Sequence, residues 1–177
     1  AAQHELGVKF DTLLRNADAA MYRAKESGRG RAVFFDRALA ARQVVASGSG
    51  LYRALRHREF SLFYQPQFGV ADGRLVGVEA LLRWQTPRNG LKYPAEFVPA
   101  AEETGLIVDI GAWVIEAACV QIAQWREQGL APPRLAVNVS AQQLRAAGFV
   151  ADLRRVLRRH ALRPELLALE FTEAVLD

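Results

Sequence analysis

The run of residues 75–84, Leu-Val-Gly-Val-Glu-Ala-Leu-Leu-Arg-Trp, constrains the fold more than any other stretch of the chain. It is apolar apart from Glu79 and Arg83, and turn-forming residues bound it on both sides, which predicts a buried strand. Alternation along a strand places Glu79, Leu81 and Arg83 on one face and the apolar majority on the other. Charged groups are seldom buried without a partner. The two charges therefore either form a structural ion pair or bind a ligand.

The rest of the chain alternates between helix and strand patterns. Predicted helices span 11–27, 36–46, 51–58, 95–104, 109–128, 141–147 and 149–160, and predicted strands span 32–35, 60–64, 135–139 and 166–171. Residues 68–70 and 74–84 are expected to form an antiparallel hairpin. Residues 47–50, Ser-Gly-Ser-Gly, are expected to interrupt the preceding helix or to act as a flexible joint. Strands separated by helices predict an α/β fold with a parallel sheet.

Three polar residues lie towards the C-terminal ends of predicted strands, each on the less apolar face. They are Glu79, Asn138 and Glu170. Two carboxylates and an amide oxygen that converge at one end of a sheet make a hard-oxygen site suited to Mg²⁺ or Mn²⁺. Taken singly, Asn138 could satisfy a turn and Glu170 could pair with a cation on a neighbouring strand.

The order of the motifs resembles the EAL domains, the cyclic di-GMP phosphodiesterases. The resemblance covers about residues 51–177 and is carried by Glu79-Ala80-Leu81 with Leu82-Arg83-Trp84, and by Tyr64-Gln65-Pro66, Pro94-Ala95-Glu96-Phe97-Val98-Pro99, Ala101-Glu102-Glu103-Thr104-Gly105-Leu106-Ile107, Val137-Asn138-Val139-Ser140 and Leu169-Glu170-Phe171-Thr172-Glu173. It implies the first half of a (β/α)8 TIM-like barrel with an antiparallel first strand.

The resemblance also implies an activity and roles for named residues. The implied reaction is hydrolysis of cyclic di-GMP to linear pGpG at a two-metal Mg²⁺ or Mn²⁺ site. Catalytic roles are implied for Glu79 and Glu170, metal ligation for Glu79, Asn138 and Glu170, substrate binding for Gln65, Leu81 and Arg83, and support of a loop and of a homodimer for Glu173. An alternative for Gln65 is that it closes a strand before Pro66, and an alternative for Glu173 is an exposed rim carboxylate.

The N-terminal residues carry a second resemblance. Residues 17–31 resemble the closing helix of a GGDEF (diguanylate cyclase) domain, and residues 32–35 resemble the short strand after it. The predicted organisation is a helix-strand remnant of an α/β GGDEF domain over 1–36, a linker over 37–50 and the N-terminal half of an EAL-like domain over 51–177. We expect residues 1–35 to be mobile or docked non-natively.

Two expectations follow from the extent of the EAL resemblance. The family's pair of aspartates, its lysine and its later glutamate would lie beyond Asp177. We therefore expect no hydrolysis by the 177-residue chain alone, and an exposed sheet edge at 166–171. A different class of function stays open: a degenerate EAL module that binds cyclic di-GMP as a receptor without hydrolysing it.

The charge of the chain adds a third alternative, a basic nucleic-acid-binding domain. The net charge is +4 and the pI is about 9.6. The densest cationic cluster is Arg154, Arg155, Arg158, Arg159 and Arg163. Helical spacing favours a solvated outer helix over a polymer-binding face, so no nucleic-acid polymer is expected as a partner.

No window of 18 uncharged apolar residues occurs, and we expect a cytoplasmic chain without direct membrane contact. The sole cysteine, Cys119, is expected to be packed and unreactive.

Overall fold

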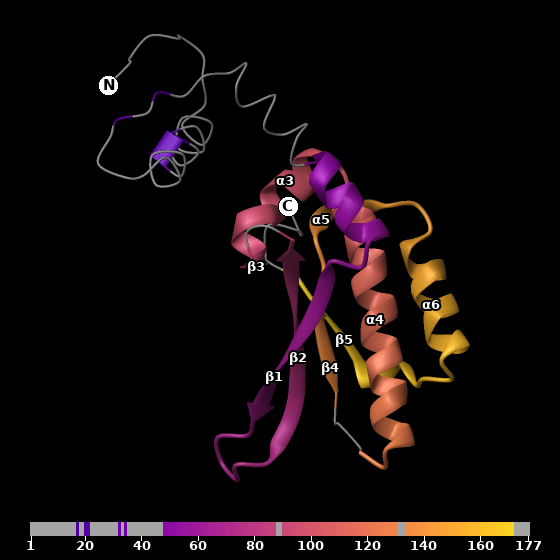
Figure 1. The fold of residues 1–177 in the computed structure, drawn as a ribbon. Coiled ribbons are helices and arrows are strands. Elements are labelled where there is room, and N and C mark those ends of the chain that lie inside the picture. Colours follow the sequence, from indigo (N-terminus) through magenta and orange to yellow (C-terminus); the bar gives the residue numbers. More distant parts are fainter. Residues whose placement is uncertain are drawn as a thin grey trace. The chain divides into compact units, whose positions relative to one another are not determined.

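A computed structural model describes residues 48–87, 90–130 and 134–171, together with Ala17, Ala20, Met21, Ala32 and Phe34. The chain divides into two compact units, Ala1–Gln43 and Val44–Asp177. The helices and strands whose bounds are given below all lie in the second unit, and Figure 1 draws them in colour.

Five residues of the first unit bear on the predicted helix-strand remnant. Ala17, Ala20 and Met21 are helical, in agreement with a helix over 11–27. Ala32 and Phe34 belong to no strand, so the predicted strand over 32–35 is wrong at these two positions. A strand needs a partner ladder and a packed face, whereas the Phe34 side chain is 83% exposed. The other residues of the predicted 1–36 remnant lie outside the described residues. Its boundaries and the expected mobility of residues 1–35 therefore stay predictions.

The second unit is built on a mixed sheet with the order β1-β2-β4-β5, and β3 adds to β2. Its strands are β1 (Phe60–Phe68), β2 (Leu75–Thr86), β3 (Gly90–Lys92), β4 (Leu135–Asn138) and β5 (Leu167–Glu170). β2 is antiparallel to β1 and β3, while β2, β4 and β5 run parallel. The predicted α/β class and the antiparallel first strand are therefore confirmed. The short strand β3 had not been predicted from the sequence.

The helices begin and end within a few residues of the predicted limits. They are α3 (Pro94–Glu103), α4 (Ile107–Glu127), α5 (Ala141–Arg145) and α6 (Phe149–Arg159), with a 3-10 turn at Pro164–Leu166. In Figure 1, α4 and α6 lie together on one side of the sheet. Crossover helices that return the chain to a parallel neighbour explain the β2-α4-β4-α6-β5 order.

The predicted break at 47–50 is wrong for residues 48–50, which are helical and continue into 51–56. Leu51 and Ala54 of this helix are fully buried, and such packing outweighs the low helix propensity of glycine. The glycines also permit close approach. A Cβ at Gly48 would lie 2.9 Å from Thr104 Cγ2, and one at Gly50 would lie 3.6 Å from the Trp84 ring.

β1 runs through Pro66, which corrects the expectation that a strand ends near Gln65. Pro66 is opposite Val78, and the Val78 N–H donates to Arg134 O on the β4 side, at 2.8 Å. The 66–78 pair is therefore not hydrogen-bonded, and the Pro66 nitrogen faces away from β2. The missing N–H costs the β1–β2 ladder nothing, as expected for proline on an edge strand.

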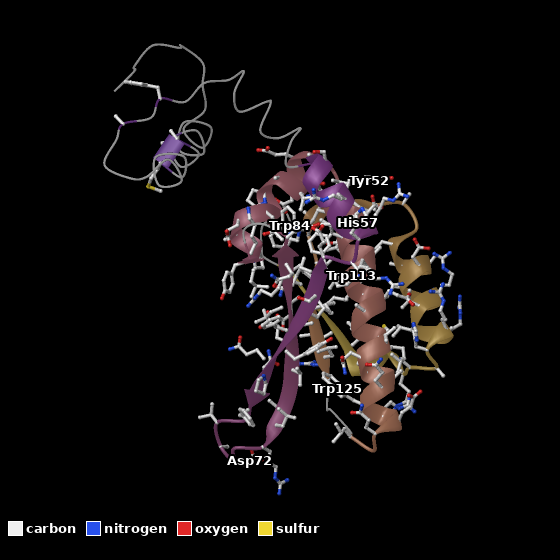
Figure 2. The ribbon with its side chains drawn as sticks, in the orientation of Figure 1. Tyr52, His57, Asp72, Trp84, Trp113 and Trp125 are labelled. Atoms are coloured by element: carbon white, nitrogen blue, oxygen red, sulfur yellow. The ribbon has the colours of Figure 1, made fainter. Side chains whose placement is uncertain are left out.

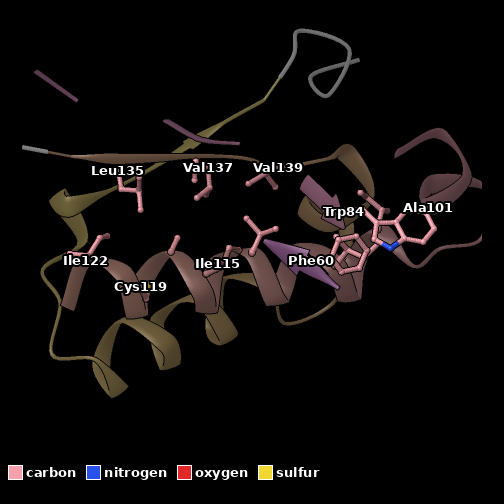
Figure 3. Packing of buried hydrophobic residues seen from close by; sticks show 14 of the residues in the cluster. Phe60, Trp84, Ala101, Ile115, Cys119, Ile122, Leu135, Val137 and Val139 are labelled. Carbon is pink, nitrogen blue, oxygen red and sulfur yellow. The ribbon is translucent and has the colours of Figure 1, made fainter. Parts of the chain in front are cut away.

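The core lies between the sheet and α4. Figure 3 shows Leu135, Val137 and Val139 facing Ile115, Cys119 and Ile122 of α4. A second part of the core gathers aromatic rings at one end of the sheet, where Phe60 and Trp84 pack 6.0 Å apart. Trp84 Nε1 donates to Glu59 at 3.0 Å, so the buried indole N–H is paired.

By length and mean hydropathy alone α4 could cross a membrane, but its buried face accounts for that composition.

α6 has the character predicted for a solvated outer helix. Leu157 is its buried residue, and the predicted cluster of arginines on and after it is exposed. Arg155 pairs with Asp152 within the helix, and Arg159 Nη1 lies 3.0 Å from Glu116 Oε2 on α4. Two of the arginines therefore form ion pairs, one within α6 and one between α6 and α4.

Candidate functional site

The sheet face opposite α4 carries the predicted polar residues. In the β1–β2 ladder Gln65 is directly opposite Glu79, Phe63 is opposite Leu81, and Ser61 is opposite Arg83. Directly opposite residues share a face. The structure thus brings Gln65, Glu79, Leu81 and Arg83 onto one surface, while Val78 and Ala80 on the other face of β2 are buried in the core.

Glu79 and Asn138 are in direct contact. Asn138 Nδ2 donates to Glu79 Oε1 at 2.9 Å, across 59 positions of sequence. β2 and β4 are parallel neighbours with Glu79 beside Ala136, so Asn138 comes two residues further towards the C-terminal ends of the strands. Alternation keeps Ala136 and Asn138 on the Glu79 face, and the small Ala136 side chain leaves the two polar groups free to meet.

Glu170 occupies the corresponding place on the next strand. It is the register partner of Asn138 in the parallel β4–β5 pair, and it is half-buried. Within the described part of the chain no cation pairs with it, so the salt-bridge alternative finds no support there. Three neighbouring strands therefore each present one of the predicted ligands on the same face.

The donor atoms fit a divalent cation. Among the described residues no group donates a hydrogen bond to Glu79 Oε2, to Asn138 Oδ1 or to either carboxylate oxygen of Glu170. Uncommitted carboxylate and amide oxygens are the ligands that Mg²⁺ and Mn²⁺ prefer. Over the same residues no cluster of three or more His, Cys, Asp or Glu side chains occurs, so this set supplies two acids and one amide.

Arg83 does not pair with Glu79 or with another carboxylate of the described residues. Its Nη1 donates to Leu82 O at 2.8 Å. Its guanidinium carbon lies 4.7 Å from the centre of the Tyr93 ring and 5.5 Å from that of Phe63. The structural ion pair considered from the sequence is therefore not formed, and the cation is available to an anionic ligand.

Tyr93 and Phe63 are site residues that the sequence-based prediction missed. Phe63 could have been found from strand alternation, since it falls on the same face as Gln65. Tyr93 directly precedes Pro94 at the start of α3, and its backbone N–H donates to Glu96 Oε2 at 2.7 Å. No signal in the sequence joins it to Arg83, because the contact depends on the pairing of β3 with β2, which had not been predicted. Glu173 lies outside the described residues.

A cavity of about 250 Å³ lies elsewhere, between α4, α5 and α6. Its charged rim is largely self-paired: Glu116 contacts Arg159 and, at 2.8 Å, His160 Nε2. Burial raises the pKa of the Glu116 carboxyl, but hydrogen bonds from His160 and Arg159 and their charges outweigh it, and the net pKa is lowered. The cavity is on the α4 side of the sheet, away from the face that carries Glu79 and Asn138.

Comparison with known proteins agrees with this arrangement. The model of the EAL domain family matches residues 49–177, which include every described strand. The chain belongs to the EAL domain family. Its relatives include cyclic di-GMP phosphodiesterases, and solved structures of EAL domains contain the bound dinucleotide.

Two curated relatives and one solved structure illustrate the similarity. The bifunctional diguanylate cyclase/cyclic di-GMP phosphodiesterase MucR of Pseudomonas aeruginosa is 46% identical over 164 residues, 92% of this chain and 24% of MucR. The cyclic di-GMP phosphodiesterase PdeR of Escherichia coli K12 is 37% identical over 99% of this chain and 27% of PdeR. A MucR phosphodiesterase structure in complex with c-di-GMP has a TM-score of 0.69 at 46% identity, over 75% of this chain and 53% of that one.

This EAL chain therefore spans about a quarter of the length of these two curated relatives. The family match begins at residue 49 and leaves the predicted GGDEF remnant outside it. The similarity to the solved MucR phosphodiesterase supports the α/β fold over 75% of this chain.

Proposed function

We propose that this EAL-family chain belongs to a parent protein that hydrolyses cyclic di-GMP to linear pGpG, and that the 177-residue chain alone does not hydrolyse it. The observation that carries the proposal is the Glu79–Asn138 contact of 2.9 Å beside Glu170, three residues of adjacent strands with uncommitted oxygens on one face. Family membership and the bound dinucleotide in solved EAL domains support the substrate. The proposed cofactor is Mg²⁺ or Mn²⁺, held by Glu79, Asn138 and Glu170.

The chemistry explains why these residue types are needed. A phosphodiester is anionic, and a bound divalent cation supplies activation of water and stabilisation of the leaving oxygen. Arg83 binds the non-bridging phosphate oxygens, for which the flat fork of a guanidinium is suited. Gln65, opposite Glu79, offers amide donors and an acceptor to the dinucleotide, and half-buried Leu81 offers an apolar surface. Glu173 is proposed to support the loop that follows β5.

We also propose that residues 1–36 are the end of a GGDEF-like domain. The similarity to MucR, a protein named for both cyclase and phosphodiesterase activities, extends over 92% of this chain and so beyond the EAL match. The linker over 37–50, the homodimer and the cytoplasmic placement stay predictions.

Hydrolysis by the full-length protein tests the proposed reaction. Conversion of cyclic di-GMP to pGpG should require Mg²⁺ or Mn²⁺. Loss of a residue that only hydrogen-bonds to a metal ligand lowers activity by ~10–100-fold. Because Glu79 is proposed to be a ligand itself, Glu79→Gln should lower kcat/KM by more than that. Glu165→Gln is the matched control, because Glu165 is exposed and lies in the 3-10 turn before β5. Turnover by Glu79→Gln close to that of Glu165→Gln would refute the ligand role.

The receptor alternative predicts a different outcome. A receptor would bind cyclic di-GMP in calorimetry with either metal present but leave it intact over hours. Binding without any pGpG in a chromatographic assay would replace the proposed hydrolase with that receptor.

A further inference from the structure

Arg83 is held by two aromatic rings from separate elements. The Tyr93 ring centre is 4.7 Å and the Phe63 ring centre 5.5 Å from the guanidinium carbon, both within cation–π range. Phe63 is on β1, and Tyr93 is the residue before α3. Each ring has its own anchor, because the Phe63 backbone is in the β1–β2 ladder and the Tyr93 N–H is bonded to Glu96 at 2.7 Å.

The rings are not part of the core. Phe63 is 49% exposed and Tyr93 is 55% exposed, and neither belongs to the buried cluster or to the hydrophobic residues packed against it. Exposed aromatic side chains that lie within cation–π range of a guanidinium at the edge of the candidate site differ from ordinary packing residues. Their contact with Arg83 is therefore the interaction that accounts for their position.

The geometry leaves the donors of Arg83 available. A guanidinium carries five N–H donors in its plane, and within the described residues the contact to Leu82 O is the hydrogen bond that this group makes. The two ring contacts are cation–π contacts, which form no conventional hydrogen bond with these donors. A cation that is held by two ring contacts can present its remaining donors to an anion with a smaller loss of rotational freedom on binding.

We propose that Phe63 and Tyr93 are positioning residues that clamp Arg83 for bidentate binding of a phosphodiester. This inference rests on the proposed function, since it deepens the role of Arg83 at the same site. The clamp acts on substrate binding. It raises affinity by pre-organising the guanidinium and leaves the chemical step to the residues around Glu79 and Asn138.

Substitution of the rings in the full-length protein tests the clamp. Tyr93→Leu and Phe63→Leu should each raise KM for cyclic di-GMP about two- to fivefold, and together about tenfold, with kcat within about twofold of wild type. Tyr93→Phe keeps the ring and should retain wild-type KM. Tyr52→Leu is the matched control, because Tyr52 is also 55% exposed but lies on the helix over 48–56.

Two further readouts separate positioning from a general structural role. In the Arg83→Ala background the ring substitutions should add nothing, since the group they position is gone. In ¹⁵N NMR of the wild type, rotation of the Arg83 guanidinium should be slower than that of exposed Arg154, and Tyr93→Leu should abolish the difference. Fully additive effects in the Arg83→Ala background would overturn the clamp, as would free rotation in the wild type. The NMR result does not depend on turnover, so a wild type that fails to hydrolyse cyclic di-GMP refutes the proposed function separately.

Discussion

Gly111 on α4 lies against Gln143 of α5. The Gln143 side chain is 3% exposed and lies against Gly111, where an added Cβ would overlap Gln143 Nε2. The same amide accepts the Ser140 N–H through Oε1 at 3.0 Å and so caps α5. A methyl group at position 111 must therefore displace a buried capping residue.

We expect Gly111→Ala to destabilise the protein by about 1–3 kcal/mol in urea unfolding, because it overpacks this contact. The sign is diagnostic, since Gly→Ala within an unobstructed helix stabilises by roughly 0.5–1 kcal/mol. Removal of the obstacle in the double variant Gly111→Ala/Gln143→Ala should make the alanine at 111 neutral or stabilising relative to Gln143→Ala alone. A stabilising effect of Gly111→Ala in the wild-type background would contradict the overlap.

Residues of the candidate site divide into those that strand alternation can find and those that it cannot. Glu79, Leu81 and Arg83 were placed on one face from the period of the strand alone, and the structure has them there. The contact of Asn138 with Glu79 needed the parallel order of β2 and β4, which the resemblance implied. Tyr93 could not be found, since its place beside Arg83 depends on the pairing of β3 with β2, which had not been predicted from the sequence.

At the scale of elements, α4 and α6 are tied by Glu116. Its two oxygens contact Arg159 Nη1 at 3.0 Å and His160 Nε2 at 2.8 Å. The pKa of Glu116 is lowered in the fold from its ordinary value of 4.5. A carboxyl with a lowered folded pKa contributes stability that is present above the ordinary pKa and is lost as the pH falls through the folded pKa.

We expect the free energy of unfolding of the wild type to fall more steeply below about pH 4.5 than that of Glu116→Gln. The partly exposed tie should contribute about 0.2–1 kcal/mol at neutral pH, the range of surface ion pairs. Denaturant titrations between pH 3 and 7 measure the difference. Glu127→Gln on the same helix is the control and should follow the wild type. Parallel curves for wild type and Glu116→Gln would show that the tie contributes no pH dependence.

The elements that the sequence predicted least well share a cause in tertiary structure. The glycines at 48 and 50 read as a break, but buried Leu51 and Ala54 hold their segment helical. Pro66 read as a strand end, but its nitrogen faces away from β2. β3 has three residues and was too short to show a period. Long periodic segments such as α4 were predicted within two residues at each end.

For the molecule as a whole, Cys119 reports on global opening. It is the sole cysteine, it is fully buried between α4 and the sheet, and burial raises its pKa to about 11. Figure 2 labels Trp113 and Trp125 on the same helix, and Cys119 lies between these two residues in the sequence of α4. The expectation that Cys119 is packed is confirmed.

We expect Cys119 to react with a thiol reagent at least about 100-fold more slowly in the native protein than in 6 M urea, because the thiolate forms only when α4 leaves the sheet. Mass spectrometry of timed alkylation measures the ratio. Gly111→Ala should speed the labelling in proportion to its loss of stability. Labelling of the native protein at the rate of a free thiol would mean that α4 opens locally.

The orientation of Pro66 gives the two borders of the sheet different chemical characters. Its nitrogen interrupts the outward row of donors on β1, so an incoming chain cannot hydrogen-bond continuously along that border. β5, from Leu167 to Glu170, has an uninterrupted row and pairs with β4 among the described residues. We therefore expect another strand to add beside β5 rather than beside β1. Intermolecular association of unfolding intermediates, where it occurs, should follow the same direction and be seeded at Leu167–Glu170.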